Sequence, residues 1–381
     1  MKIAVLYAHP VEPDGLSIQG NLLYRGLKEL GQDVLPCHHA PSFQKQWTLD
    51  AFKPDVAIGV GCWTYVPEIV LSPQNSGITP VPWFVANGWV ANYHRLISEL
   101  PLVFVTSHWV KETYERDGVK TDNFVVLPIG FDPEEIKPIP KSDYRVQRLR
   151  EMLGIQPNEK MILTVGGDVT SKGAQEMFKA LAKIQPKFNA WKYVLKTWES
   201  ESAEIHGQEE ERLIAELGLE KGRIQYLSGA FSHEFMSYLL SAADIYAAPS
   251  RLEGFGMIQM EAQACGIPVI SINVGGPADT IKHNETGFLA RVGETIQLTE
   301  EWANEDMGFD AQHKIKFNQP KVFAYRANID DLAEYTLRLL TDDKLRQEMG
   351  RNAYEHAQKN FHYRLIAERA LRAIKDRLGF S

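Results

Sequence analysis

Two glutamates, Glu253 and Glu261, lie eight residues apart in the stretch RLEGFGMIQMEAQACG, residues 251–266. Between them Gly254 and Gly256 flank a turn, and a helical stretch follows. A helix N-terminus attracts anions, because its first backbone N–H groups are unpaired and its dipole is positive there. Two carboxylates would repel a phosphate at that place. A ligand with hydroxyl groups on both sides of a diphosphate resolves the conflict, since carboxylates accept hydrogen bonds from hydroxyls.

A second segment, TVGGDVTSKGA at 164–174, combines a strand, a glycine turn and a lysine just before a helix. Gly166 and Gly167 let the backbone approach a ligand, and Lys172 is placed to pair with phosphate. The segment is not a Walker loop, because the GK[ST] signature is absent. Taken alone, it fits an ordinary strand-to-helix turn with an exposed lysine equally well.

Two further glycine turns follow strands. In the first, HPVEPDGLSIQGN at 9–21, Gly15 belongs to a tight turn, Ser17 is predicted to cap the next helix, and Gly20 permits close approach. The other is NVGGPADT at 273–280. The first turn lacks the G-x-G-x-x-G pattern, so dinucleotide binding is not supported. Glycine-rich turns in both halves of the chain favour a phosphate-bearing ligand over a purely structural explanation.

Each glutamate alone also fits a surface position. Glu261 can face solvent from the helix, and Glu253 can interact with the helix dipole. Their combination with the glycine turns and Lys172 makes the ligand-binding interpretation the preferred one.

Apolar runs and helix-like segments alternate along the chain, which indicates parallel sheets covered on both faces. Predicted strands in the first half are 3–8, 55–61, 81–87, 102–107 and 124–130, and predicted helices are 17–30 and 108–118. Predicted strands in the second half are 160–167, 191–198, 223–229, 243–250, 268–276 and 286–292. Predicted helices there are 173–185, 207–217, 232–242, 256–265, 328–340, 342–359 and 362–378. The proline-rich segment 132–143 reads as a linker. Two doubly wound α/β domains are therefore expected, with ligands beyond the carboxyl ends of the strands.

Residues 293–327 do not follow this alternation of strands and helices and are predicted to form an inserted loop or lid. A surface excursion without function is an equal alternative.

The composition is that of a globular protein, with 44% apolar residues and a net charge of −8. The negative charge disfavours nucleic acid as the main partner. No apolar run approaches the length of a transmembrane span. Three scattered cysteines (Cys37, Cys62 and Cys265) suit a reducing compartment, so a cytoplasmic location is expected.

The stretch APSRLEGFGMIQMEAQACGIPVIS followed by GGPADTIKHNETGFL resembles the retaining GT-B glycosyltransferases of family GT4, which use nucleotide sugars. TVGGDVTSKG, VVLPIGFD at 125–132 and the opening loop share the resemblance. It implies a GT-B fold with two Rossmann-like domains facing across a cleft. Residues 1–138 would form the acceptor-side domain, with 361–381 crossing back onto it. Residues 139–360 would bind the donor.

The resemblance also implies roles for single residues. Glu261 would bind the ribose hydroxyls, Glu253 the hydroxyls of the transferred sugar, and Lys172 the leaving diphosphate. The remaining donor-binding positions implied are Gly15, Gly166, Gly167, Lys196, Gly229, Ala230, Gly254, Phe255, Gly256 and Met257.

The chain departs from the family pattern at three places. Gly167 stands where many members have arginine, so Arg251, Lys196 or another cation would have to replace it. Lys196 begins a stretch, Lys-Thr-Trp-Glu, where many members have a G-x-G-P turn. Members of the family often have a histidine at the end of a strand in the first domain, near the reacting sugar. In this chain Asn87 stands at the matching position, and His108 and His9 are other candidates for the role.

The activity implied is transfer of a hexosyl unit from a UDP- or GDP-sugar to a hydroxyl acceptor, with retention, front-face attack, and neither metal nor cofactor. The acceptor would be a small molecule, glycan or glycolipid. A soluble acceptor is favoured, because residues 1–140 carry 10 Lys and Arg against 15 Asp and Glu. The alternatives are a GT-B sugar-nucleotide epimerase, a phosphorylase, and a non-catalytic nucleotide-binding protein.

Overall fold

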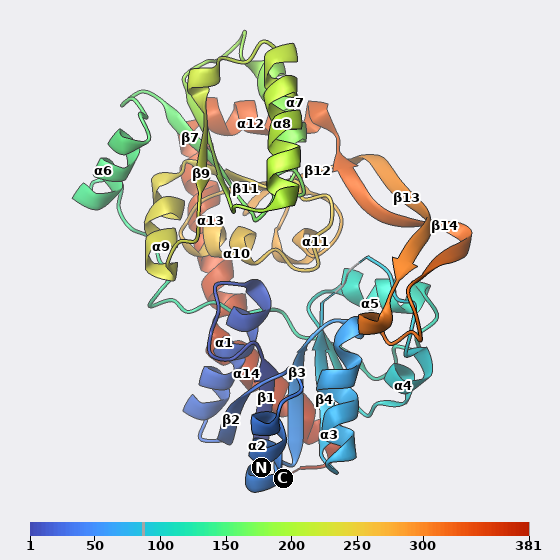
Figure 1. Cartoon of the computed structure of the whole chain (residues 1–381). Coiled ribbons are helices and arrows are strands. Elements are labelled where there is room, and N and C mark those ends of the chain that lie inside the picture. The colour runs from blue at the N-terminus through green and yellow to red at the C-terminus, as the bar shows by residue number, and fades with distance from the viewer. Residues whose placement is uncertain (86–87, 381) are drawn as a thin grey trace. The chain divides into compact units, whose positions relative to one another are not determined.

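The computed structural model describes residues 1–85 and 88–380, and the chain divides into two compact units. Unit 1 contains residues 1–132, 297–323 and the segment from 361 onward, and unit 2 contains 133–296 and 324–360. Each unit holds one six-stranded sheet with helices on both faces (Figure 1). The doubly wound α/β class predicted from the alternating pattern is confirmed.

All strands of the unit 1 sheet are parallel. Their order is β2 (Asp33–His38), β1 (Lys2–Tyr7), β3 (Val56–Gly61), β4 (Thr79–Phe84), β5 (Val103–Val105) and β6 (Phe124–Val126). Every residue of β3 is buried, as a continuous apolar run in a covered parallel sheet requires. The strand order reverses between β1 and β3, so the switch point lies between the loops that follow these two strands.

The helices of unit 1 are α1 (Gly15–Glu29), α2 (Phe43–Phe52), α3 (Ser72–Asn75), α4 (His94–Glu99), α5 (His108–Arg116) and α14 (Tyr363–Leu378). A 3₁₀ turn η1 (Trp63–Tyr65) and a π-helical turn η2 (Pro67–Leu71) follow β3.

The prediction that Ser17 caps α1 was wrong, because Asp14 is the cap and accepts from the backbone N–H groups of Leu16 and Ser17. The Ser17 hydroxyl instead donates to the Ala8 carbonyl at 2.6 Å. The close approach expected at Gly20 is present, since a Cβ there would lie 2.4 Å from the Tyr7 ring.

Helix α14 packs against α1 within unit 1. The Tyr363 hydroxyl donates to Glu29 at 2.6 Å, and the Tyr363 backbone N–H donates to the Phe131 carbonyl at 3.0 Å. The two helices approach closely at Gly26, where a Cβ would lie 2.6 Å from the Ala367 Cβ. The segment that follows unit 2 in sequence is therefore part of the unit 1 core.

The unit 2 sheet is also entirely parallel. Its order is β12 (Gly287–Ala290), β11 (Val269–Ile272), β10 (Ile245–Ala247), β7 (Lys160–Val165), β8 (Trp191–Thr197) and β9 (Ile224–Ser228). The order reverses between β7 and β10, which lie side by side. The loops that carry TVGG and LEGF follow these two strands, so the fold brings the two segments together.

The helices of unit 2 are α6 (Tyr144–Met152), α7 (Ala174–Ile184), α8 (Glu201–Glu216), α9 (His233–Ala242), α10 (Met257–Ala264), α11 (Pro277–Thr280), α12 (Ile329–Thr341) and α13 (Asp343–Phe361), with a 3₁₀ turn η3 (Lys221–Arg223). Helix α8 begins six residues before its predicted start, because Ser200 caps it and Glu201 and Glu204 lie in its first turn. Its exposed, polar N-terminal half has no apolar periodicity that would reveal it.

The predicted loop at 293–327 is instead a two-stranded ribbon, formed by β13 (Val292–Ala303) and β14 (His313–Ala327) with a 3₁₀ turn η4 (Glu305–Met307) between them. Residues 297–323 of this inserted ribbon belong to unit 1, although the segment interrupts unit 2 in sequence. Ile315 and Phe317 alternate with charged residues, a period of two that is typical of a half-covered strand.

No helix within residues 1–85 or 88–380 has both the length and the apolar character needed to cross a bilayer.

The contact between α1 and α14 predicts opposite effects of two glycine-to-alanine substitutions. Gly26→Ala should destabilise the protein by about 1–3 kcal/mol, because the new Cβ meets Ala367 and the helices must separate. Gly207→Ala, in α8 with no atom within 4 Å of its Cβ, should stabilise by about 0.5–1 kcal/mol through helix propensity. Urea unfolding of both variants measures the difference. Equal stabilisation by both would show that the two helices do not pack this tightly.

Candidate active site

The candidate site of unit 2 lies at the switch point of its sheet. Residues 166–173 follow β7, and residues 248–256 follow the neighbouring strand β10. Both loops leave the carboxyl ends of their strands, where open α/β sheets bind ligands. Each loop leads into a helix whose N-cap is a glycine with positive φ, at Gly173 and Gly256.

Lys172 and Glu253 form an ion pair. The Lys172 Nζ lies 2.7 Å from Glu253 Oε2, and both side chains are mostly buried. The second carboxylate oxygen of Glu253 accepts from the Gly256 backbone N–H at 3.1 Å. The sequence predicts separate partners for these side chains, whereas the structure orients each through the other.

The turn that carries Glu253 rests on a second glycine turn. The Gly276 backbone N–H donates to the Glu253 carbonyl at 2.8 Å. A Cβ at Gly276 would lie 2.3 Å from the Phe255 Cα, which no side chain can accommodate. The third glycine turn, 273–280, is therefore the support of the turn at 253–256.

Helix α10 has no side-chain cap within the described part of the chain. Its N-cap, Gly256, has φ of +92°, a conformation that L side chains rarely adopt. Backbone N–H groups at an uncapped helix start can be satisfied by an anionic ligand. Met257 is the first helical residue, so the predicted role of this turn as an anion site is geometrically possible.

Glu261 lies on α10 and is only 2% exposed, so the alternative that it faces solvent is wrong. Burial raises the pKa of its carboxyl to about 7. Its Oε1 lies 3.7 Å from His233 Nε2, and its Oε2 has no hydrogen-bond partner among residues 1–85 and 88–380. A buried carboxylate oxygen in this state suits a ligand hydroxyl.

His233 and Glu135 are two residues that the sequence reasoning missed. His233 Nδ1 lies 3.0 Å from Glu135 Oε2, while its other ring nitrogen approaches Glu261. His233 is the first residue of α9, which Ser232 caps. Its place three residues after Ala230, which was predicted to bind the donor, was the signal that could have identified it.

Lys196 is the last buried residue of β8. It pairs in register with Val165, so it lies beside the TVGG loop. It is 5% exposed, and burial lowers its pKa to about 8. Its ammonium lies over the rings of Trp198 and Phe231, at 4.9 and 5.6 Å from their centroids. These aromatic faces leave its N–H groups available to an anion.

Arg251, the other candidate to replace the missing arginine, is engaged elsewhere. It donates to Gln175 at 2.9 Å and pairs with the buried Glu176 at 3.1 Å. Gly167 itself accepts hydrogen bonds through its carbonyl from the Thr197 hydroxyl and the Trp198 backbone. Lys196 is thus the cation best placed to compensate.

The segment with Gly229 and Ala230 adjoins the same strand end. The Gly229 backbone N–H donates to the Thr197 carbonyl at 3.2 Å, and Gly229 has φ of +116°. Phe231 then contacts Lys196. Predicted donor-binding residues of unit 2 therefore gather around the carboxyl ends of β7, β8 and β10.

The remaining predicted residues belong to unit 1. Gly15 is the first residue of α1, beside its cap Asp14. His108 is exposed at the start of α5, which Ser107 caps. His9 lies after β1, with its Nδ1 3.2 Å from the Tyr7 hydroxyl. Asn87 lies outside the described residues.

The match to a known protein family lies mostly in unit 2. Residues 146–303 match the family described as glycosyl transferases group 1. D-inositol 3-phosphate glycosyltransferase of Corynebacterium aurimucosum is 26% identical over 71% of this chain and 60% of its own length. N-acetyl-alpha-D-glucosaminyl L-malate synthase of Bacillus anthracis is 26% identical over 70% of this chain and 57% of its own length. The chain thus aligns with less than two thirds of either relative.

Solved structures match over nearly the whole chain. Sucrose-phosphate synthase from Thermosynechococcus elongatus has a TM-score of 0.73 at 19% identity, covering 100% of both chains. Anabaena HepE, solved in complex with UDP and glucose, has a TM-score of 0.72 at 18% identity, covering 99% of this chain and 100% of its own. The fold is GT-B with two Rossmann-like units, as the sequence predicts.

Burial of Glu261 predicts a pH-dependent stability. Its folded pKa of about 7 lies above the usual 4.5, so its stabilising contribution is complete below pH ~4.5 and lost as pH rises through 7. Over that interval it should lower the free energy of unfolding by roughly 3 kcal/mol at most. Glu261→Gln should remove this part of the slope, measured by urea unfolding between pH 4.5 and 7.5. The exposed Glu209→Gln is the control, and parallel slopes for wild type and Glu261→Gln would contradict the burial.

Proposed function

We propose that this protein transfers a hexosyl unit from a nucleotide-diphosphate sugar to a hydroxyl acceptor with retention, because residues 146–303 match the glycosyl transferases group 1 family. The observation that carries the proposal is the group formed by Lys172, Glu253, Lys196 and Glu261 at the switch point of unit 2. Lys172, Lys196 and Glu253 lie at the carboxyl ends of the adjacent strands β7, β8 and β10, and Glu261 lies on the helix α10 that follows. Two cations and two carboxylates in this arrangement suit a ligand with diphosphate at its centre and hydroxyls on both sides.

The diphosphate is bound by Lys172, Lys196 and the start of α10. Lys196 carries its charge in a buried place, where an anion is attracted strongly because little water screens it. Lys172 is already oriented by Glu253, so it needs no reorganisation when charge develops on the leaving group. These fixed cations and the helix dipole take the part that a bound metal ion plays in other transferases, and we propose that the reaction needs neither a metal nor a cofactor.

The ribose is bound by Glu261. Its unpartnered Oε2 accepts from a ribose hydroxyl, and the hydrogen bond favours the ionised carboxylate. Phe231 and its neighbours Gly229 and Ala230 lie near the base. UDP is the first nucleotide to test, since the similar Anabaena protein was solved with it, and GDP is the second.

Glu253 binds hydroxyls of the transferred sugar. Both of its oxygens already accept hydrogen bonds, from Lys172 and Gly256, so it is a positioning group and not a free nucleophile. This arrangement supports front-face attack. The bond from the sugar's anomeric carbon to the leaving diphosphate oxygen breaks, the acceptor oxygen bonds to that carbon on the same face, and the acceptor proton passes to the diphosphate.

The acceptor is a hydroxyl compound of the soluble phase. The acidic balance of residues 1–140 disfavours anionic surfaces, including most membranes. The names of the curated relatives contain D-inositol 3-phosphate and L-malate, which are small and polar compounds. A small molecule or free glycan is therefore favoured over a glycolipid.

The two lysines predict a selective loss of diphosphate binding. Lys172→Met and Lys196→Met should each weaken UDP or GDP about 10- to 100-fold, whereas UMP or GMP should change less than about threefold. Lys187→Met, an exposed lysine outside the site, is the matched control. Isothermal titration with both nucleotides gives the ratio. An unchanged diphosphate-to-monophosphate ratio in both variants would refute the assignment.

Transfer itself is tested with UDP- and GDP-hexoses and a panel of sugar and polyol acceptors. The product should keep the anomeric configuration of the donor, seen by proton NMR, and turnover should persist in EDTA. Glu261→Ala should reduce kcat/KM by at least about tenfold through lost binding of ribose.

Three other results would each indicate a different activity. A new nucleotide sugar formed without acceptor indicates an epimerase, and dependence on inorganic phosphate indicates a phosphorylase. Nucleotide binding without turnover indicates a binding protein.

A further inference from the structure

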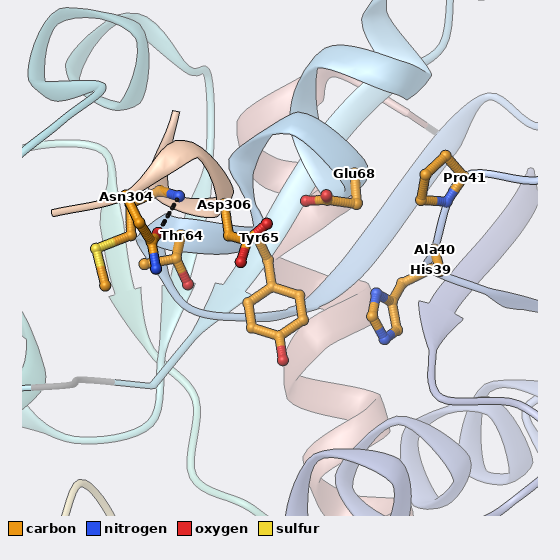
Figure 2. Close-up of a pocket in the computed structure, with 9 residues that line it drawn as sticks. His39, Ala40, Pro41, Thr64, Tyr65, Glu68, Asn304 and Asp306 are labelled. Atoms are coloured by element: carbon orange, nitrogen blue, oxygen red, sulfur yellow. Dashed lines mark hydrogen bonds between the residues drawn. The ribbon is translucent and has the colours of Figure 1, made fainter. Parts of the chain in front are cut away.

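A cavity of about 350 Å³ lies within unit 1, at the carboxyl ends of β2 and β3. It is lined by His39, Ala40 and Pro41 after β2, by Thr64, Tyr65 and Glu68 after β3, and by Asn304, Asp306 and Met307 of the inserted ribbon. Figure 2 shows Tyr65 between the ribbon residues and His39. The cavity flanks the switch point of the unit 1 sheet, so it lies where this architecture binds ligands.

The ribbon wall of the cavity is built into unit 1. Asn92 Nδ2 donates to the carbonyls of Met307 and Gly308, at 3.1 and 3.0 Å. Gly308 has φ of +78°, and a Cβ there would lie 1.8 Å from the Tyr93 hydroxyl. Further along the ribbon, Lys321 pairs at 2.7 Å with the buried Asp117. These contacts fix the turn that carries Asp306.

The opposite wall offers uncharged hydrogen-bonding and ring surfaces. Burial, together with nearby His38 and Lys45, lowers the pKa of His39 to about 4, so its imidazole is neutral at pH 7. Its Nδ1 is buried and has no hydrogen-bond partner in the described part of the chain. The Tyr65 ring lies edge-on to His39 with centroids 5.2 Å apart. Such faces suit the apolar side and the hydroxyls of a sugar ring.

The charged lining is acidic. Glu68 and Asp306 are close enough that the Asp306 charge adds to burial in raising the pKa of Glu68. The nearby cation, Lys45, is 3% exposed and donates to the carbonyls of His39 and Glu68 at 2.6 and 2.7 Å. None of the lining residues within the described ranges is Lys or Arg. A phosphate or carboxylate in this cavity would face repulsion with no cation directed at it.

We propose that this cavity binds the acceptor, that the inserted ribbon supplies one of its walls, and that Asp306 with Glu68 restricts the acceptor to an uncharged polyhydroxyl compound such as a sugar ring. The inference rests on the proposed function and extends it to the acceptor class. The inserted ribbon is then a specificity element of unit 1.

Binding of matched neutral and phosphorylated sugars tests the proposal. The probes are glucose, galactose, mannose, N-acetylglucosamine and inositol, with the 6-phosphates of the hexoses, measured by saturation-transfer NMR on the full chain with UDP present. Wild type should bind a neutral sugar of this panel in preference to any phosphorylated one.

Two lysine variants of the same turn give a matched pair. Asp306→Lys should shift the neutral-to-phosphorylated binding ratio by about tenfold toward the phosphorylated sugar. Glu305→Lys makes the same charge change one residue away, outside the cavity lining, and should leave the ratio within about twofold. Equal shifts in both variants, or a wild-type preference for phosphorylated sugar, or no binding by any neutral sugar, would each overturn the proposal.

Asn92→Ala tests the wall without a change of charge. Loss of its two hydrogen bonds to the turn should weaken the bound neutral sugar several-fold. UDP affinity, titrated on the same preparations, should stay at the wild-type value in all three variants. A protein that binds neither UDP nor GDP would refute the proposed function, whereas intact nucleotide binding with unchanged sugar binding in Asn92→Ala would refute only the ribbon wall.

Discussion

The geometry of the unit 2 site depends on one backbone contact, the hydrogen bond from the Gly276 N–H to the Glu253 carbonyl. It forms only because residue 276 has no side chain. The contact fixes the turn at 253–256, the turn fixes the Glu253 carboxylate, and the carboxylate orients Lys172 at 2.7 Å. The start of α10 follows directly, so its N–H groups and Glu261 take their places from the same contact.

Two buried charges give this site its electrostatic character. Burial raises the pKa of Glu261, although the nearby His233 opposes the shift, and burial lowers the pKa of Lys196. Groups with such shifts concentrate at functional sites. A ligand that brings hydroxyls to the carboxylate and negative charge to the ammonium would supply what burial removes. The fold alone does not require either group, which makes both more informative than an exposed lysine or glutamate.

The sequence predicted those parts that depend on local pattern. Continuous apolar runs predicted the parallel strands, and the glycine turns with Lys172 and Glu253 predicted where the loops of unit 2 converge. Contacts between distant segments were not predictable, such as the approach of His233 to Glu261. The inserted ribbon was mistaken for a loop because its strands are largely exposed, and its signal was confined to short alternations such as that of Ile315 and Phe317.

Unit 1 is assembled from three separate stretches of chain, and this has a consequence for biosynthesis. Residues 361–380 provide α14, which covers α1, yet they leave the ribosome after all of unit 2 has been made. The ribbon residues 297–323 also emerge late. Unit 1 can therefore not complete its core during synthesis of its own first 132 residues, and the surface of α1 around Gly26 stays uncovered until translation reaches α14. Unit 2, whose last stretch ends at 360, is synthesised completely before unit 1, although unit 1 begins first in the sequence.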